Sequence, residues 1–205
     1  MKQKHFIDSH KGITGLVILG LMAYFERWDN MTAWAYLATH GVYGLLWAMK
    51  SRAFPDKSWE ATCGLGYGFV IWGSLSLYWI APYLITSGNL HAPPWLIGIC
   101  VASFSFGVFL HFAADMQKHI QLAHAPGLIT DGLWARSRNP NYLGELLIYG
   151  GFSALAMHWA PLVALGLFFV VVWVPNMLKK DKSLSRYPEF DAYARRSGLF
   201  FPRFR

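Results

Sequence analysis

Charged residues are scarce in this sequence of 205 residues. Aspartate, glutamate, lysine and arginine together make up 14% of it, whereas hydrophobic residues make up 55%. An ordinary soluble domain carries about 25% charged residues, and the mean hydropathy of this chain is positive. The composition therefore excludes a soluble globular enzyme and predicts a protein embedded in a lipid bilayer.

Cysteine is nearly absent, and no cleavable leader is recognisable. Cys63 and Cys100 have a spacing that implies no pairing, so we expect packing roles and no disulfide framework. The polar residues 8–11 directly precede the first apolar run, and no small-residue cleavage site follows before Glu26. We therefore expect a retained first helix rather than a signal peptide.

Closely spaced histidines are lacking as well. The chain has eight histidines, but they form no repeated boxes of the kind that a membrane di-iron enzyme uses. Imidazole ligands for a metal need such convergent spacing. We expect no metal site.

Long apolar runs dominate the sequence. A helix needs about 20 apolar residues to cross the hydrocarbon core of a bilayer. Six stretches approach that length, at 12–25, 33–49, 67–86, 94–113, 142–159 and 161–178. We predict an all-α integral membrane protein with about six transmembrane helices, forming one domain over residues 1–205.

The basic residues gather in alternate loops, and the opposite loops contain only Arg27. They are Lys2, Lys4 and Lys11 before the first span, Lys50, Arg52 and Lys57 after the second, Lys118, Arg136 and Arg138 after the fourth, and Lys179, Lys180, Lys182, Arg186, Arg195, Arg196, Arg203 and Arg205 in the tail. This bias predicts a multi-pass protein with both termini in the cytoplasm. We expect the membrane to be a bacterial inner membrane. Anionic lipid headgroups account for the net charge of +7, so we expect no nucleic-acid partner.

The longest connection between apolar runs, residues 115–141, is rich in polar groups. One helical face carries His111, Asp115, Lys118 and Leu122, which predicts that the fourth helix continues beyond the bilayer. Pro126 and Gly127 should end this extension. Pro140 suits the first turn of the next helix, where its missing amide donor costs nothing.

Asn141 and Glu145 lie one turn apart at the start of that next helix. A carboxylate that faced lipid there would be costly, so both side chains should point at protein, water or ligand. Arg136 and Arg138 precede them and could bind phosphate groups. A polar network that only holds helices together remains the structural alternative.

Residues 132–145 read GLWARSRNPNYLGE and are preceded by DMQK at 115–118. Together they resemble the cofactor-binding core of the membrane-embedded steroid 5α-reductase and sterol reductase family, including its uncharacterised bacterial relatives of the DUF1295 type. The tail at 186–202, RYPEFDAYARRSGLFFP, resembles the closing segment of that family. The resemblance covers roughly residues 113–205.

The resemblance implies a pocket for NADPH on the cytoplasmic side, within a core of about residues 111–205. The residues that it implies for cofactor binding are Asp115, Lys118, Arg136, Arg138, Asn141, Tyr142, Glu145, Lys179, Lys180, Arg186 and Tyr187. Glu145 is also a catalytic candidate. Asn139 departs from the pattern, because many relatives have a histidine there, so a role for a titrating imidazole is in doubt.

Residues 41–46, which read GVYGLL, are similar to the family's helix that bears a catalytic tyrosine. The resemblance implies that Tyr43 donates a proton or polarises a carbonyl. By residue type alone, a tyrosine in an apolar helix is more often a packing residue. The family's acidic partner of this tyrosine has no clear counterpart, and Asp8 is the candidate on the cytoplasmic side.

The expected function is an NADPH-dependent reductase of the CH-CH class, similar to 3-oxo-5α-steroid 4-dehydrogenases. It would act on a conjugated carbon-carbon double bond in a lipophilic steroid-like or isoprenoid substrate that enters from the membrane lipids. One alternative is an S-adenosylmethionine-dependent methyltransferase of the isoprenylcysteine carboxyl or phospholipid type, which shares the helical core. The short chain favours that alternative, whereas residues 115–118 and Asn141 favour the reductase. A non-catalytic membrane protein is the third hypothesis.

Overall fold

The computed structural model describes residues 1–204, so Arg205 of the basic tail lies outside the described residues. About three quarters of the chain is helical, and the described residues form no strand. The predicted fold class, an all-α integral membrane protein, is confirmed. The chain divides into two compact units, residues 1–104 with 149–165 and residues 105–148 with 166–205. Each unit is described by itself, and a single domain stays a prediction.

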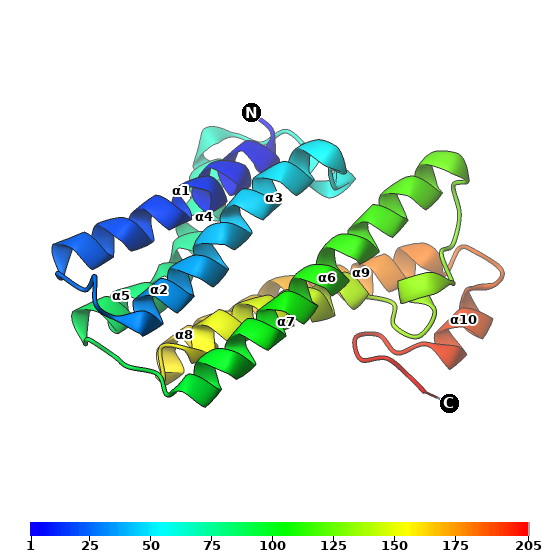
Figure 1. The fold of residues 1–205 in the computed structure, drawn as a ribbon. Coiled ribbons are helices and arrows are strands. Elements are labelled where there is room, and N and C mark those ends of the chain that lie inside the picture. The colour runs from blue at the N-terminus through cyan, green and yellow to red at the C-terminus, as the bar shows by residue number, and fades with distance from the viewer. Residues whose placement is uncertain (205) are drawn as a thin grey trace. The chain divides into compact units, whose positions relative to one another are not determined.

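The helices follow one another through short connections (Figure 1). The first unit contains α1 (Gln3–Tyr24), α2 (Met31–Tyr36), η1 (Leu37–Gly41), α3 (Val42–Ala53), η2 (Lys57–Glu60), α4 (Leu65–Leu75), η3 (Ser76–Trp79) and α5 (Ile80–Ser87). The second contains η4 (Gly132–Trp134), η5 (Phe169–Trp173), α9 (Val174–Leu184) and α10 (Phe190–Arg196). Three helices contribute residues to both units: α6 (Pro94–His124), α7 (Pro140–Ala154) and α8 (Trp159–Phe168).

Each of the six predicted spans is mostly helical, although α7 ends at Ala154, within the span 142–159. Four helical segments of the described chain are long and apolar enough to cross a membrane. These are Gln3–Tyr24, Leu65–Ser87, Pro94–His124 and Trp159–Leu184. The helix α7 has only 15 residues, below the length of about 20 that spans a bilayer. The helical segment 31–53 is long enough, but polar side chains such as Thr39 and His40 lower its hydropathy. The orientation of the spans stays a prediction.

The first helix begins earlier than the apolar pattern predicted. The expected span started at residue 12, with Lys11 before it, but α1 already begins at Gln3. His10 is 1% exposed and Lys11 is 6% exposed, so neither belongs to a solvated flank. The reason is helical periodicity: Ile7, Lys11 and Thr14 share the buried face that continues to the end of the helix.

The helix α1 runs beside α3 in the first unit (Figure 1). Gly44 makes this approach possible, because a Cβ atom there would collide with the backbone carbonyl of Lys11. The segment that contains α3 is one continuous helix from Met31 to Ala53, with a π-helical turn at Leu37–Gly41. This segment buries Tyr36, His40 and Tyr43.

In the second unit, α6 and α7 cross at two glycines. A Cβ atom on Gly107 would lie 2.7 Å from the carbonyl oxygen of Gly144, and one on Gly144 would lie 2.5 Å from the backbone nitrogen of His111. Small residues at such crossings let two helix backbones approach closely. The predicted extension of α6 to the Pro126 region and the start of α7 at Pro140 are both confirmed.

We predict that Gly144→Ala destabilises the protein by about 1 to 3 kcal/mol, because the added methyl group collides with the α6 backbone. The measurement is thermal unfolding of the detergent-solubilised protein. Gly150→Ala on the same helix is the matched control, since a Cβ atom there meets nothing within 4 Å. This control should be neutral or slightly stabilising. Equal melting temperatures for the two variants would contradict the close helix crossing.

Candidate functional site

A group of polar side chains from α6 and α7 lies in the second unit. The ring of His111 is within 3.1 Å of the backbone carbonyl oxygen of Asn141, which joins the two helices. Asp115 is 4% exposed, and its carboxylate lies 3.9 Å from Nε2 of His111 and 3.5 Å from Nζ of Lys118. Asp115 and Lys118 thus lie side by side, and His111 links them to the backbone of Asn141. Their role in cofactor binding stays a prediction.

Asn141 carries an acceptor that the described residues leave unused. Its side-chain oxygen is shielded from solvent and has no hydrogen-bond partner among residues 1–204. A buried polar atom without a partner is uncommon and calls for an explanation such as a ligand or water. Asn141 and the half-buried Glu145 lie in the first turns of α7, where helix amides favour anionic groups.

Arg138 connects three segments of the second unit. Its Nε donates to both carboxylate oxygens of Asp181 on α9, at 3.1 and 2.9 Å. Its Nη1 donates to the carbonyl oxygens of Ala194, at 3.3 Å, and Ser197, at 2.6 Å. Such charge-assisted hydrogen bonds are about twice as strong as neutral ones. The contacts of Arg138 therefore hold the C-terminal segment against α9 and the residues before α7.

Neighbours of Arg138 bind the same C-terminal segment. The hydroxyl of Ser137 donates to the carbonyl oxygen of Phe200 at 2.7 Å, and Nδ2 of Asn139 donates to that of Leu199 at 2.7 Å. An isolated parallel bridge joins Ser137 to Gly198. We name residues 136–139 together with 197–203 the tail clamp. Asn139, which replaces a common histidine, thus has a structural contact that needs no titrating ring.

The hydroxyl of Tyr193 on α10 completes the attachment. It donates to the carbonyl oxygen of Trp134 at 2.7 Å, and the tyrosine is 2% exposed. Burial raises the pKa of Tyr193 to about 12, so this hydroxyl remains a neutral donor across the physiological range. Three aromatic residues of the tail, Phe190, Tyr193 and Phe200, are buried.

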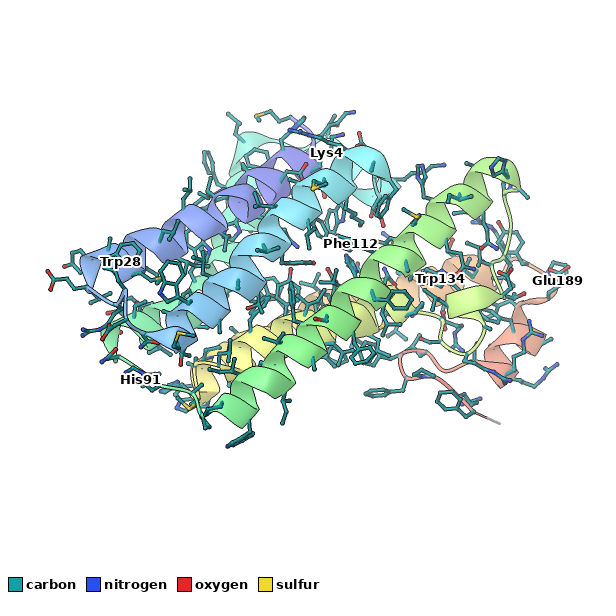
Figure 2. All side chains as sticks on the ribbon, in the orientation of Figure 1. Lys4, Trp28, His91, Phe112, Trp134 and Glu189 are labelled. Carbon is teal, nitrogen blue, oxygen red and sulfur yellow. The ribbon has the colours of Figure 1, made fainter. Side chains whose placement is uncertain are left out.

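Trp134 occupies the centre of this attachment and is labelled in Figure 2. Its indole nitrogen donates to the carbonyl oxygen of Ala114 at 3.2 Å. The ammonium of Lys180 lies 4.6 Å from its ring centroid and also donates to the carbonyl oxygen of Arg138. Lys180, one of the cofactor candidates, is therefore engaged with protein groups.

The remaining cofactor candidates of the second unit are more exposed. Arg136, Lys179 and Arg186 are exposed, and the guanidinium of Arg186 donates to the hydroxyls of Ser183 and Tyr187. Tyr142 is half-buried and packs against Trp173, with ring centroids 5.7 Å apart. Their predicted contacts with a cofactor stay predictions.

Of the three catalytic candidates, Tyr43 and Asp8 belong to the first unit, whereas Glu145 belongs to the second. Tyr43 is fully buried. Asp8 accepts hydrogen bonds from the indole nitrogen of Trp47 at 3.0 Å and from the hydroxyl of Ser51 at 2.8 Å. Because α1 begins at Gln3, Asp8 is a half-buried residue that ties α1 to α3 and not an exposed acid of a terminal tail.

The sequence pattern did not single out Lys11, which is the charged residue next to Tyr43. Its ammonium nitrogen lies 2.8 Å from the hydroxyl oxygen of Tyr149 and 3.4 Å from that of Tyr43. The spacing of Lys11 from Ile7 and Thr14, four and three residues, was the available signal for burial. The apolar count instead assigned Lys11 to the basic flank.

His10, also assigned to that flank, lies between two tryptophans. Its ring stacks on Trp79 at 4.5 Å and meets the edge of Trp72 at 5.0 Å. Both ring nitrogens are shielded from solvent without a hydrogen-bond partner among the described residues. The contacts of His10 described here are therefore those with the rings of Trp79 and Trp72. In the described chain no three histidine, cysteine or acidic side chains converge as metal ligands would.

Residues 65–197, well over half of the chain, match a family that is described as "Protein of unknown function (DUF1295)". The chain belongs to the DUF1295 family. This family is associated with steroid 5α-reductase-like proteins, so the resemblance is confirmed at that level. The match includes the polar group on α6 and α7 and residues 136–139 of the tail clamp, but it ends at Ser197, the first residue of the other half of the clamp. Asp8, Lys11 and Tyr43 precede the match.

Curated proteins that are similar to this DUF1295 chain are named for metal resistance. The cobalt-zinc-cadmium resistance protein CzcN of Cupriavidus metallidurans is 28% identical over 126 residues, which cover 61% of the chain and 52% of that protein. The nickel-cobalt-cadmium resistance protein NccN of Alcaligenes xylosoxydans xylosoxydans is 35% identical over 77 residues, 37% of the chain and 36% of that protein. The chain spans about half or less of these relatives. No solved structure matches it.

We predict that Arg138→Met loosens the tail clamp. Removing one partner of a mostly buried ion pair should cost about 2 to 3 kcal/mol, reduced somewhat because the pair keeps some contact with water. Limited trypsin digestion should then cleave after Arg195 and Arg196 at least about tenfold faster, since cleavage follows the open population. Arg186→Met, at an exposed arginine, is the matched control. Unchanged cleavage of the Arg138 variant would show that the clamp does not hold the tail.

Proposed function

We propose that this protein is an NADPH-dependent reductase of a conjugated carbon-carbon double bond in a lipophilic carbonyl compound. The substrate class is steroid-like or isoprenoid. The polar group on α6 and α7 binds the cofactor, and Tyr43 of the first unit handles the proton. The link between the DUF1295 family and steroid 5α-reductase-like proteins supports this assignment.

The unused side-chain oxygen of Asn141 carries the proposal. It is shielded from solvent without a partner among the described residues, and it lies at the start of a helix. His111, which contacts the backbone of Asn141, also lies 3.9 Å from the buried carboxylate of Asp115. An amide oxygen in that position suits the N–H donors of a carboxamide or an aminopurine, which NADPH offers. Lys118 nearby supplies a cation of the kind that binds phosphate. The donors and acceptors present therefore fit the cofactor.

Other residues of the second unit keep this group in place. Gly107 and Gly144 permit the close crossing of α6 and α7, and His111 joins the two helices through the Asn141 carbonyl. Arg138 holds the tail instead of reaching toward a ligand. The cations that we assign to the phosphate groups are Arg136, which is exposed, and Lys118, which also pairs with Asp115.

The chemistry divides between the cofactor and the chain. NADPH, when bound, would supply the hydride that the β-carbon of the conjugated system needs. Tyr43 donates a hydrogen bond to the carbonyl oxygen, where negative charge develops, or delivers the proton that the α-carbon needs. The net reaction adds one hydride and one proton across the double bond. Apolar surroundings of the reacting group strengthen the hydrogen bond from Tyr43.

The metal-resistance names of the curated relatives do not carry this proposal, since the chain spans about half or less of those proteins. The methyltransferase alternative would place S-adenosylmethionine in the second unit. That cofactor also has an adenine and a carboxylate to bind, so Asn141 alone does not separate the two. The choice depends on a direct comparison of ligands.

We expect NADPH to raise the melting temperature of the detergent-solubilised protein, whereas S-adenosylmethionine does not, because a ligand stabilises the state that binds it. Asn141→Ala should weaken NADPH binding by about 1 to 3 kcal/mol, the cost of removing one buried polar partner. Asn176→Ala, at an exposed asparagine on α9, is the matched control.

Two results would oppose the reductase, and a third would oppose the role of Asn141. Stabilisation by S-adenosylmethionine alone would assign the site to a methyltransferase. No shift with either ligand would favour a non-catalytic membrane protein. Equal NADPH affinity in the Asn141 and Asn176 variants would remove Asn141 from the cofactor site.

We also predict that Tyr43→Phe lowers NADPH-dependent reduction of progesterone, a 3-oxo-Δ4 steroid probe, by about 100-fold or more, the usual contribution of a positioned acid. The ring is kept and only the hydroxyl is lost, so NADPH affinity should not change. Tyr36→Phe is the control, because Tyr36 is equally buried and its hydroxyl contacts His40. Wild-type turnover by the Tyr43 variant would leave Tyr43 as a packing residue.

A further inference from the structure

The ammonium group of Lys11 is buried inside the first unit. Lys11 lies in the third turn of α1, a helix long and apolar enough to span a membrane, and is 6% exposed. Its nitrogen is 2.8 Å from the Tyr149 hydroxyl and 3.4 Å from the Tyr43 hydroxyl. An ionisable residue at such a position is costly, and its partners indicate what it does.

Aromatic rings surround this ammonium. It lies 3.4 Å from the ring centroid of Trp47, 4.6 Å from that of Tyr43 and 5.5 Å from that of Tyr149. A cation is attracted to the faces of such rings, most strongly to that of tryptophan. The rings are themselves fixed: Tyr43 and Tyr149 meet edge to face at 5.7 Å, and Tyr149 stacks on Tyr78 at 4.4 Å. The ammonium therefore has one defined place.

A second buried tyrosine on the same helical segment shows what is particular to Tyr43. Tyr36 is also fully buried, but its hydroxyl bonds to the ring of His40 at 2.8 Å and donates to the carbonyl oxygen of Tyr78 at 3.1 Å. Those contacts are ordinary hydrogen bonds between neutral groups. Tyr43 instead has a cation beside its oxygen, which favours a negative charge on that oxygen.

We propose that Lys11 is a positioning residue for Tyr43, acting through charge on the tyrosine hydroxyl. The inference rests on the proposed reductase function, in which Tyr43 delivers the proton. It also supplies the partner for which Asp8 was the only sequence candidate, since Asp8 bonds to Trp47 and Ser51. The partner is a cation, which stabilises the product of proton release.

In the proposed step, a proton moves from the Tyr43 hydroxyl to the substrate. The O–H bond of Tyr43 breaks, its proton goes to the α-carbon of the enolate formed by hydride addition, and the electron pair stays on the tyrosine oxygen. The ammonium of Lys11 stabilises this phenolate until a proton from water restores the hydroxyl. The Tyr149 hydroxyl keeps the ammonium directed, because it accepts a hydrogen bond from Lys11.

The test measures the phenolate directly and needs no substrate. Tetranitromethane is an apolar reagent that nitrates tyrosine in its ionised form. Nitration of the full-length protein in detergent at mildly alkaline pH is followed by peptide mass spectrometry, with Tyr36 as the internal control. We expect Tyr43 to be nitrated at least about tenfold faster than Tyr36 in the wild type.

Variants of Lys11 test whether its ammonium group causes the faster nitration of Tyr43. Lys11→Met should reduce the excess nitration of Tyr43 at least tenfold while the Tyr36 rate stays the same, which also shows that the fold persists. Lys11→Arg, which keeps a cation, should restore much of it. Equal rates at Tyr43 and Tyr36 in the wild type would overturn the proposal. So would a Tyr43 rate that Lys11→Met leaves unchanged.

The result separates this inference from the reductase itself. Lys11-dependent nitration without stabilisation by NADPH would support an effect of Lys11 on the Tyr43 hydroxyl but contradict the proposed reductase function. Stabilisation by NADPH without Lys11-dependent nitration would leave the reductase and remove Lys11 from it. In a protein that passes both tests, Lys11→Met should lower kcat for progesterone reduction and leave the affinity for NADPH unchanged.

Discussion

The second unit depends on the guanidinium of Arg138. A planar cation with five donors, mostly removed from water, must find acceptors in the protein. Arg138 finds them on α9 through Asp181, on α10 through Ala194 and directly after α10 through Ser197. If the tail left, Nη1 of Arg138 would lose its carbonyl acceptors, although Asp181 would still pair with Nε. The folding of the last residues is thereby coupled to the start of α7, where the candidate cofactor residues lie.

Each unit contains a buried charged side chain, and the two side chains are stabilised by different kinds of neighbour. In the second unit, the carboxylate of Asp115 has Lys118 within an ion-pair distance, and water can still reach the lysine. In the first unit, the ammonium of Lys11 is held by ring faces and hydroxyl oxygens. An ion pair is largely neutral to a ligand, whereas a cation held by neutral groups keeps its field. The second arrangement suits a site where negative charge appears for a short time.

Much of the helical framework could be predicted from the sequence, because apolar length is a direct consequence of bilayer thickness. Pro140 and Pro126 marked helix boundaries for backbone reasons that hold in any context. Hydropathy could not predict that His10 and Lys11 are buried, because both are polar residues. The residues that surround them come from distant parts of the chain. The same holds for Arg138. The sequence shows an arginine near the motif, but only the fold shows that this arginine forms an ion pair with Asp181.

The π-helical turn at Leu37–Gly41 affects how related sequences align with this helix. A π turn takes up one residue more than an α turn, so the helix after it is rotated by about 100° relative to an uninterrupted one. Tyr36 before this turn, His40 within it, and Tyr43 and Trp47 after it are all buried. A related chain without the extra residue would present the equivalent of Tyr43 one position earlier. An alignment that allows no gap within this helix would therefore miss that tyrosine.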